Sequence, residues 1–345
     1  MKAVGYAKSL PINDPESLID IELPPLVATG QDLLVKVKAI AVNPVDYKVR
    51  LNMPPTAGEY KVIGWDAVGE VVATGEAVTQ FKPGDVVYYA GDITRQGSNA
   101  EYQLVDERLV GHKPKSLSDA EAAALPLTAI TAWEILFEHL AIQQQSPDSA
   151  ATSDEVILVV GAAGGVGSIL IQLAKAITGA TVIATASRES SQAWVKKLGA
   201  DYVVDHRLPL QPQIEALIAN NGLGPLTHVA SLNSTDSYFD SYTEMLAPFG
   251  KIALIDDPQT FNVANLKPKS LSLHWEFMFA RSKFKAADMH EQSRLLNRVS
   301  DLIDQGYIQT TVGKNLGAIN ANNLRTAHAE LESGRSIGKI VLEGF

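Results

Sequence analysis

Residues 156–167 read VILVVGAAGGVG, and this stretch indicates how the middle of the chain folds. Its first five residues are all apolar, which is typical of a strand buried on both faces of a parallel sheet. A glycine-rich turn follows, and residues 169–177 form an apolar helical stretch. With a further strand expected at residues 181–185, this order predicts one strand–helix–strand unit of an α/β domain.

The glycine-rich turn has the spacing of a dinucleotide-binding fingerprint. Gly164 and Gly167 take the second and third glycine places, and Ala162 stands at the first. Free N–H groups near Gly165, Val166 and Gly167 would face a pyrophosphate, with the dipole of the following helix behind them. The turn therefore predicts a nucleotide site, and a turn that serves packing alone is the alternative.

The end of the next strand indicates which dinucleotide is bound. An NAD site normally carries an acidic side chain there for the ribose 2′-OH, but residues 182–188 read VIATASR. Ala186 stands at the acidic place, and Ser187 and Arg188 follow with groups that bind a 2′-phosphate. We expect NADPH; a solvated Ser–Arg pair in a surface loop is the alternative.

Strands and helical stretches keep alternating beyond this unit. Short apolar or β-branched runs recur at residues 202–204, 228–232 and 251–255. Strands that alternate with helices predict a doubly wound parallel sheet.

The first 125 or so residues are β-rich instead. Residues 32–42 alternate apolar and polar side chains and then become wholly apolar, as a strand does on entering a core. Further strands are expected at residues 68–72 and 86–89, and turns at Asn43-Pro44 and Pro83-Gly84-Asp85. This part predicts a small antiparallel barrel or sandwich.

Helical signals complete the chain. Ser118 and Glu121 have the spacing of a capping box ahead of an alanine-rich helix. A second helical stretch covers residues 127–142, and a polar loop follows at 143–154. The last part has a helical run at residues 292–305 and a closing strand at 338–342.

Composition excludes several classes of protein. The 29 basic and 39 acidic residues give a formal net charge of −10, which disfavours nucleic acid as a partner. The absence of cysteine excludes disulfides and cysteine-ligated metals. No run approaches the roughly 18 uninterrupted apolar residues of a membrane span, and the first ten residues lack the apolar core of a signal peptide. We expect a cytoplasmic protein that does not bind membranes.

Taken together, the motifs resemble the medium-chain dehydrogenase/reductase superfamily. The nearest branch is the zinc-type alcohol dehydrogenase-like proteins, which are akin to the zeta-crystallin-like quinone oxidoreductases. The resemblance implies a GroES-like β-rich catalytic domain of residues 1–126 and 275–345 and a Rossmann domain of residues 127–274. The motifs that carry it, besides the glycine-rich turn, are Asn43-Pro44-Val45-Asp46, Gly64-Trp65-Asp66-Ala67-Val68-Gly69, Pro83-Gly84-Asp85, Leu198-Gly199-Ala200-Asp201, Phe249-Gly250-Lys251 and Gly338-Lys339-Ile340-Val341-Leu342.

The family name implies zinc, but this sequence departs from the zinc pattern. Trp65 stands where zinc enzymes have a His ligand, and Asn43-Pro44 stands where a Cys ligand normally lies. His274 and Glu276 are a close His–carboxylate pair in sequence, and a structural histidine is the expected role there. We expect no metal, since catalytic zinc needs about three protein ligands.

The resemblance implies hydride transfer from NADPH to a quinone, an enone or a similar conjugated carbonyl. In this branch the residue matching Asn43 lies near the nicotinamide, and Asp46 helps to shape the site. Lys48 stands where the branch commonly has Tyr; it is either a proton donor or a surface lysine. Thr131 matches a threonine on the nicotinamide side of the cofactor. The catalytic candidates are therefore Asn43, Asp46 and Lys48.

Other departures and alternatives remain open. The pyrophosphate-binding arginine of classical alcohol dehydrogenases falls on Gly338, so neither Arg335 nor Lys339 inherits its role by alignment. Two other functions fit the sequence: an alcohol dehydrogenase with non-Cys zinc ligands, and a non-catalytic NADPH-binding protein. By family analogy we expect a homodimer that pairs at an edge of the Rossmann sheet, near residues 251–255 and beyond.

Overall fold

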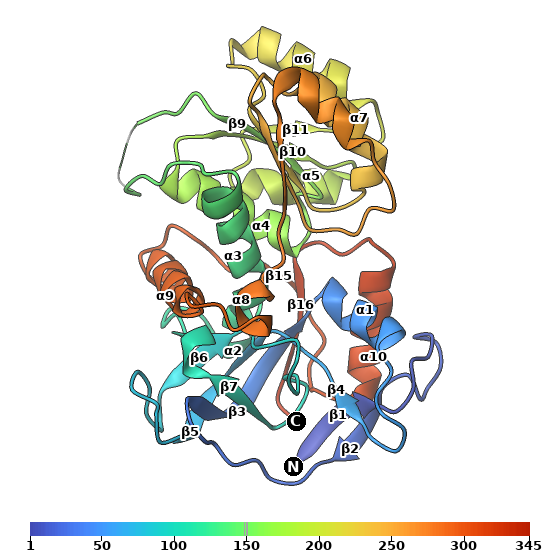
Figure 1. The fold of residues 1–345 in the computed structure, drawn as a ribbon, viewed down its shortest axis with the longest axis vertical. Coiled ribbons are helices and arrows are strands. Elements are labelled where there is room, and N and C mark those ends of the chain that lie inside the picture. Colours follow the sequence, from blue (N-terminus) through green and yellow to red (C-terminus); the bar gives the residue numbers. More distant parts are fainter. Residues whose placement is uncertain (148, 150) are drawn as a thin grey trace. The chain divides into compact units, whose positions relative to one another are not determined.

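The chain folds into two compact units. The computed structural model describes residues 1–345 except Asp148 and Ala150. The first unit comprises Met1–Ile130 and Phe279–Phe345, and the second comprises Thr131–Met278 (Figure 1). The chain leaves the first unit within helix α3 (Pro126–Trp133) and returns just before helix α8 (Ala280–Lys283). From the sequence, we expected the domain boundaries between residues 126 and 127 and between residues 274 and 275.

The second unit is built on one six-stranded parallel sheet of order β11-β10-β9-β12-β13-β14. Its strands are β9 (Val156–Val160), β10 (Thr181–Thr185), β11 (Tyr202–Val204), β12 (His228–Ser231), β13 (Lys251–Leu254) and β14 (Ser272–Trp275). The chain starts in the middle, runs outward to β11 and then crosses back to β12. This is the doubly wound order, so the expected fold class is confirmed.

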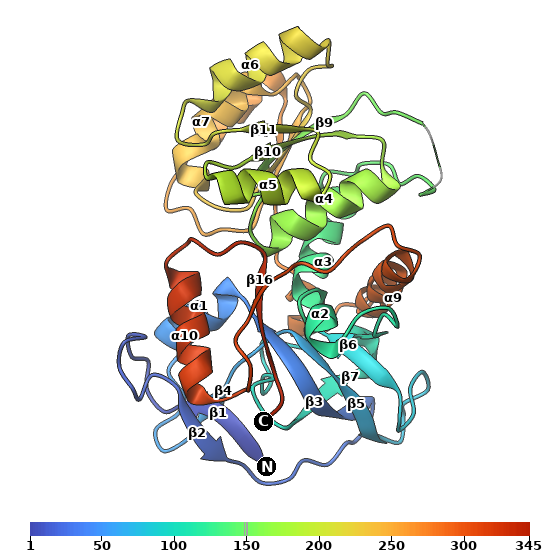
Figure 2. The ribbon, with the colours of Figure 1, turned by 180° about the vertical axis from the view of Figure 1, so that it is seen from behind.

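Helices cover both faces of this sheet (Figures 1 and 2). Helices α4 (Gly165–Ile177) and α5 (Glu189–Lys197) lie on one face, and α6 (Leu210–Asn221) and α7 (Thr235–Met245) lie on the other. Side chains alternate along β9, so Val156, Leu158 and Val160 pack in the same core as residues of α6 and α7. Every residue of β9 is buried, which explains its uninterrupted apolar run.

The first unit is β-rich and contains two sheets. The larger sheet is mostly antiparallel. Seven strands form that sheet, in the order β15-β16-β3-β5-β6-β8 with β7 paired to β3. A three-stranded sheet has the order β2-β1-β4. The strands are β1 (Lys2–Tyr6), β2 (Ile19–Glu22), β3 (Asp32–Val42), β4 (Lys61–Val62), β5 (Ala67–Thr74), β6 (Val86–Tyr89), β7 (Tyr102–Asp106), β8 (Val110–His112), β15 (Val312–Asn315) and β16 (Lys339–Glu343). Only β15 and β16 pair in parallel.

Asn43-Pro44 begins a helix instead of the expected turn. Helix α1 (Pro44–Asn52) has Asn43 as its N-cap and Pro44 as its first residue, where a fixed φ and a missing N–H cost nothing. Arg50 is fully buried near its end. Its guanidinium donates to the carbonyl of Leu10 and to the carboxylate of Glu332 in helix α10 (Ala321–Glu332). These bonds hold α1 in place within the first unit.

The helical stretch expected at residues 127–142 divides in two. After α3 the chain forms a π-helix, η2 (Glu134–His139), a rare form that is frequent at functional sites. The expected capping box is confirmed, because Ser118 and Glu121 bond reciprocally at the start of α2 (Asp119–Ala123). The run Asp119–His139 is long and apolar enough to span a membrane, but 89% of its apolar window is buried within the protein. It is therefore typical of a core helix.

Candidate functional site

The start of helix α1 carries two buried polar side chains, Asn43 and Asp46. The backbone N–H of Asn43 donates to Asp46 Oδ2 at 2.5 Å, which ties the first turn of the helix to its cap. Asp46 Oδ1 has no hydrogen-bond partner among the residues that the structure describes. The first unit thus brings two of the three catalytic candidates together.

Asp66 and Lys339 complete this group from distant parts of the chain. Lys339 Nζ donates to Asp66 Oδ2 at 2.9 Å and to Asn43 Oδ1. Asn43 Nδ2 donates to Asp66 Oδ2 at 2.8 Å, and the backbone N–H of Leu127 donates to Asp66 Oδ1 at 2.7 Å. We call Asn43, Asp46, Asp66 and Lys339 the buried polar cluster; Asp66, Asn43 and Asp46 are at most 1% exposed.

Strand pairing explains why Lys339 meets Asn43. Strand β16 runs antiparallel to β3, with Ile340 opposite Val42. Lys339 opens β16 and Asn43 follows the last residue of β3, so the two side chains come from adjacent strand ends. The motifs around Lys339 and Asp66 were visible in the sequence, but no chemical role was predicted for either residue.

The cluster holds two carboxyl groups and one ammonium group. Burial raises the pKa of Asp46 to about 7, and the charge of Asp66 adds to the rise, while the N–H of Asn43 and Lys339 oppose it. Burial also raises the pKa of Asp66, against the opposing effects of Lys339 and the Leu127 N–H. Asp46 has the fewest hydrogen bonds, so it is the carboxyl that retains a proton most readily.

The residues of the first unit do not fit a zinc ion. Trp65, at the place of the histidine ligand, is buried and packs edge-on against Phe279 with ring centroids 5.9 Å apart. Asn43, at the place of the cysteine ligand, has its amide committed to Asp66 and Lys339. The donor set therefore already surrounds a cation, the ammonium of Lys339. Within residues 1–147, 149 and 151–345, no group of three or more His, Asp or Glu side chains has an arrangement that would hold a metal.

Lys48 lies on another face of helix α1. It follows Asp46 by two residues, which corresponds to a rotation of about 200° around the helix axis. Its side chain is half-buried, whereas Asp46 is fully buried. The Cβ atoms of Lys48 and Asp46 thus point to different faces of the helix, and the catalytic role of Lys48 stays a prediction.

The glycine-rich turn of the second unit has the geometry that a phosphate-binding turn requires. Gly161 adopts a φ of +78°, a conformation that favours glycine, and its N–H donates to Thr185 Oγ1 at 3.2 Å. A Cβ on Gly167 would lie 2.4 Å from the carbonyl oxygen of Ala162, so the third glycine lets the helix approach the strand end. A Cβ on Gly164 would meet only the Gly161 oxygen, at 3.4 Å. The open side of Gly164 is the space that a pyrophosphate needs.

Helix α4 starts at this turn with unpaired N–H groups. Gly164 is its N-cap, and the N–H groups of Gly165, Val166 and Gly167 have no acceptor within the helix. Gly165 and Val166 are half-buried, so their backbone is reachable from solvent. Because α4 has 13 residues, its dipole adds to the attraction for an anion. Ala162, at the first glycine place, has a fully buried side chain, and its contact with the cofactor stays a prediction.

The end of β10 lies beside this turn. Strands β9 and β10 are parallel neighbours, so their carboxyl ends meet at the same edge of the sheet. Ala186 is buried, Ser187 is half-buried and Arg188 is exposed as the N-cap of α5. The second unit therefore places Ser187 and Arg188 at the sheet edge that carries the glycine-rich turn, with no acidic side chain at the place of Ala186.

The remaining predicted residues lie elsewhere in the second unit. Thr131 is buried in α3. Glu276, which lies two residues after His274 in sequence, binds His139 instead, with 2.7 Å between Oε2 and Nε2. The ring of His274 instead stacks on His139 with centroids 5.7 Å apart. Glu276 thus joins the end of the π-helix η2 to the segment after β14.

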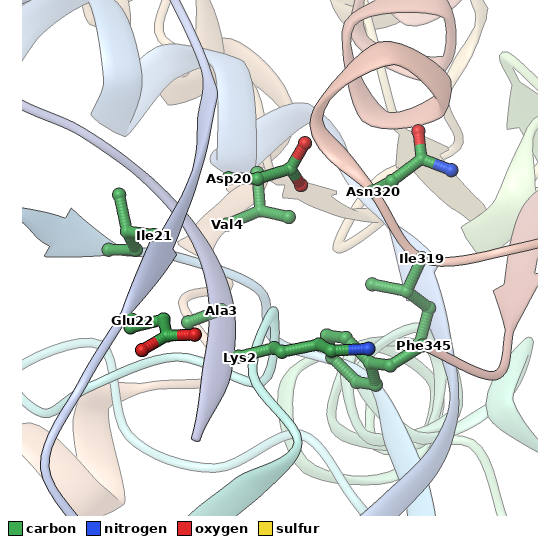
Figure 3. Close-up of a pocket in the computed structure, with 9 residues that line it drawn as sticks. All are labelled: Lys2, Ala3, Val4, Asp20, Ile21, Glu22, Ile319, Asn320 and Phe345. Atoms are coloured by element: carbon green, nitrogen blue, oxygen red, sulfur yellow. The ribbon is translucent and has the colours of Figure 1, made fainter.

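A pocket of about 390 Å³ lies at another place in the first unit (Figure 3). Lys2, Asp20 and Glu22 from strands β1 and β2 line it, together with Ile319 and Phe345 near the chain end. None of the predicted site residues is among its lining residues. It has no part in the site described above.

A doubly wound sheet with a glycine-rich turn, joined to a β-rich unit, is the architecture of a two-domain oxidoreductase. Comparison with known families agrees. Residues 29–115 match the alcohol dehydrogenase GroES-like domain, and residues 165–292 match the zinc-binding dehydrogenase family. The chain belongs to the zinc-type alcohol dehydrogenase-like proteins of the medium-chain dehydrogenase/reductase superfamily. The expected family is confirmed.

Two curated relatives illustrate this membership. A zinc-type alcohol dehydrogenase-like protein of Staphylococcus aureus (strain COL) is 39% identical over 346 residues, which cover 99% of each chain. The 2-methylene-furan-3-one reductase of Solanum lycopersicum is 43% identical over 190 residues, which cover 50% of this chain and 44% of the relative.

Two solved structures are similar over the whole chain. A protein from Rhizobium etli CFN 42 described as a zinc-dependent alcohol dehydrogenase is 53% identical, with a TM-score of 0.94 and coverage of 100% and 98%. The quinone oxidoreductase of Escherichia coli in complex with NADPH has a TM-score of 0.81 at 24% identity, with coverage of 99% and 100%. At 24% identity, the similarity to the Escherichia coli protein shows a shared fold and nothing more.

Proposed function

We propose that this protein is an NADPH-dependent, zinc-independent reductase of conjugated carbonyl compounds such as quinones and enones. The observation that carries the proposal is the end of β10, where Ala186, Ser187 and Arg188 lie beside the glycine-rich turn. An acidic side chain at Ala186 would repel a 2′-phosphate, and its absence together with the two donors favours NADPH over NADH.

The second unit supplies the groups that would hold this cofactor. The N–H groups at the start of α4 bind its pyrophosphate, and Ser187 and Arg188 bind its 2′-phosphate. The family resemblance implies that Thr131 and Asn43 contact its nicotinamide side. When bound, NADPH supplies a hydride from nicotinamide C4.

The donor set of the first unit supports this class of acceptor. Because its residues do not fit zinc, no Lewis acid polarises a substrate oxygen, and the substrate itself must spread the charge that hydride addition creates. A conjugated carbonyl does so by delocalisation onto its oxygen. The tomato relative, named as a reductase of a methylene furanone, supports an enone acceptor.

The buried polar cluster provides a donor and a proton. Asn43 uses one Nδ2–H for Asp66, and its second Nδ2–H is the donor that it can offer to an oxygen of a bound molecule. Burial raises the pKa of Asp46 to about 7, so its carboxyl is partly protonated at neutral pH, and we propose it beside Lys48 as a candidate for the proton source. A protonated carboxyl of this kind acts as a general acid near its own pKa.

Replacing Arg188 with alanine tests the cofactor proposal. One charge-assisted hydrogen bond contributes about 1.5–3 kcal/mol, so NADPH affinity should fall about tenfold to a hundredfold while NADH affinity is unchanged. Quenching of Trp194 is a suitable signal, because its indole N–H donates to Ser168 Oγ at 2.8 Å and Ser168 in turn bonds to Gly164.

Arg207→Ala is the matched control for that variant. Arg207 is an exposed arginine of the second unit that pairs with Asp205, so its loss should leave both affinities unchanged. Equal affinities of the unaltered protein for NADPH and NADH would contradict the assignment of Ser187 and Arg188.

Zinc-dependent alcohol oxidation is the second candidate function, because the 53% identical Rhizobium etli protein is described in those terms. Acceptor reduction by the purified protein should be unchanged after treatment with a chelator, and its zinc content should be well below one ion per chain. Stoichiometric zinc whose removal abolishes activity would favour the second function. A protein that binds NADPH tightly and reduces no acceptor in a broad panel would instead be a non-catalytic binding protein.

We also propose a homodimer that pairs through strand β14. The edge was expected near residues 251–255 and beyond; β13 lies inside the sheet, and β14 is its last strand. Trp275 on this strand is 53% exposed, which favours a covering partner. Sedimentation should give twice the 37.0 kDa of one chain, and a mass of one chain would refute the proposal. Separately, we propose that the protein is cytoplasmic.

A further inference from the structure

The ammonium group of Lys339 is fully used in hydrogen bonds inside the first unit. Its three N–H groups have three acceptors: Val42 O at 2.9 Å, Asp66 Oδ2 at 2.9 Å, and Asn43 Oδ1. The side chain is only 3% exposed. Lys339 therefore has no proton left to offer a bound molecule, and its charge acts on its neighbours.

These bonds determine which way the amide of Asn43 faces. Its oxygen accepts from Lys339, and its Nδ2 donates to Asp66. If the amide turned over, its NH₂ group would face the ammonium and its oxygen would face the carboxylate, which gives two repulsive contacts in a buried place. The amide is therefore held in one orientation.

This orientation decides what Asn43 offers to a ligand. Its oxygen already accepts from Lys339 and one Nδ2–H goes to Asp66, so the hydrogen that the amide has left is its second Nδ2–H. In this orientation Asn43 presents a hydrogen-bond donor toward a bound oxygen. Without the ammonium, the carboxyl of Asp66 would protonate more readily and would no longer require a donor from Asn43.

We propose that Lys339 is a positioning residue that locks the Asn43 amide as a donor, providing the fixed positive charge that a metal ion provides in a zinc site. The inference rests on the proposed function, because only there does Asn43 face the nicotinamide and the acceptor. Lys339 acts through Asn43 and touches neither reactant.

The first test measures the amide itself and needs no activity. In the ¹⁵N-labelled full-length protein, the side-chain amide signals of Asn43 are assigned by their loss in Asn43→Ser. Lys339→Met keeps an unbranched side chain of similar length and removes the charge. The NMR signals of the Asn43 amide protons should therefore shift, and these protons should exchange with solvent about tenfold faster or more. Lys113→Met is the matched control, because Lys113 is a largely buried lysine of the same unit whose Nζ donates to the carbonyls of Pro114 and Leu117. It should leave the signals unchanged.

The second test is a double-mutant cycle on turnover with whichever conjugated acceptor the unaltered protein reduces. Lys339→Met should lower kcat about tenfold to a hundredfold, the loss of one oriented charge-assisted bond, with little change in the affinity for NADPH. Because Lys339 acts through Asn43, adding Lys339→Met to Asn43→Ala should lower kcat no further. A generally loosened fold would lower the NADPH affinity as well.

The outcomes separate this inference from the proposed function. Unchanged amide signals in Lys339→Met, or additive effects in the cycle, would overturn the inference. If the unaltered protein reduces no acceptor, the proposed function fails, and the amide measurement decides on Lys339 alone. If Lys339→Met does not fold, Lys339→Met with Asp66→Asn removes both charges together, and the same amide change is expected there.

Discussion

Gly167→Ala is expected to lower the free energy of unfolding by about 1–3 kcal/mol or more, as overpacking of a filled interior does. The new Cβ would lie 2.4 Å from the carbonyl oxygen of Ala162 and 2.6 Å from its carbonyl carbon and Cα. All three are backbone atoms of a fully buried residue, so no flexible side chain can yield. Chemical denaturation followed by circular dichroism measures the loss.

Gly164→Ala should separate binding from stability in the same turn. Its Cβ meets one atom, at 3.4 Å, and the backbone at Gly164 has a φ of −75°, which any residue adopts. The cost in stability should stay below about 1 kcal/mol, as expected for alanine at an N-cap. NADPH affinity should nevertheless fall tenfold or more, since the methyl group would stand where a pyrophosphate approaches.

The two variants thus have opposite expected patterns. Gly167→Ala changes stability first, and Gly164→Ala changes cofactor affinity at nearly constant stability. If Gly164→Ala bound NADPH like the unaltered protein, the glycine-rich turn would serve packing alone. A stable Gly167→Ala would show that the strand end and helix α4 can move apart at little cost.

The second large effect is a pH dependence of stability that Asp46 causes. Its pKa is raised from 3.8 to about 7 in the folded protein, because the carboxyl is buried. Between these two values the unfolded chain has lost the proton and the folded chain retains it, so stability falls as the pH rises from about 4 to about 7. Each pKa unit corresponds to about 1.4 kcal/mol, which gives an effect of a few kcal/mol.

Asp46→Asn should remove this dependence. The amide oxygen can still accept from the Asn43 N–H, and no charge has to be buried at high pH. The variant should match the unaltered protein in stability near pH 4 and exceed it by up to a few kcal/mol above pH 7. The difference in unfolding free energy between the two proteins, measured across this range, isolates the contribution of this one group.

Asp205→Asn is a control of opposite sign. Asp205 lies at the surface, and its hydrogen bonds to Arg207 lower its pKa to about 2. Its ionised form is favoured by folding, so its contribution to stability is present above the unfolded pKa and is lost as the pH falls toward 2.

The prediction for Asp46 has a clear contrary outcome. Parallel pH profiles for Asp46→Asn and the unaltered protein would show that Asp46 is ionised in the folded state between pH 4 and pH 7.

The elements that could be predicted are those with a local signal. The buried strand β9, the glycine-rich turn and helix α4 are contiguous in sequence, and hydrophobic periodicity and glycine spacing report directly on them. Strand β3 was expected over its observed residues because its alternation is regular. The capping box of Ser118 and Glu121 was visible for the same reason.

Features with competing local signals were harder to predict. Asn43-Pro44 has the composition of a turn, yet the same two residues serve equally well as N-cap and first residue of α1. Nothing in residues 127–142 distinguishes a regular α-helix from the π-helix η2. Likewise, Glu276 has His274 two residues away in sequence but binds His139, since tertiary packing selects the partner.

By itself, the sequence predicted the two-domain plan, the family and the glycine-rich turn that starts helix α4, because each of these depends on residue types at short fixed spacings. Only the tertiary structure decided how the candidate site is held together. Lys339 and Asn43 are 296 positions apart, and they meet because β16 pairs with β3. The orientation of the Asn43 amide and the raised pKa of Asp46 both arise from burial among such distant partners, and short-range sequence patterns carry no information about those contacts.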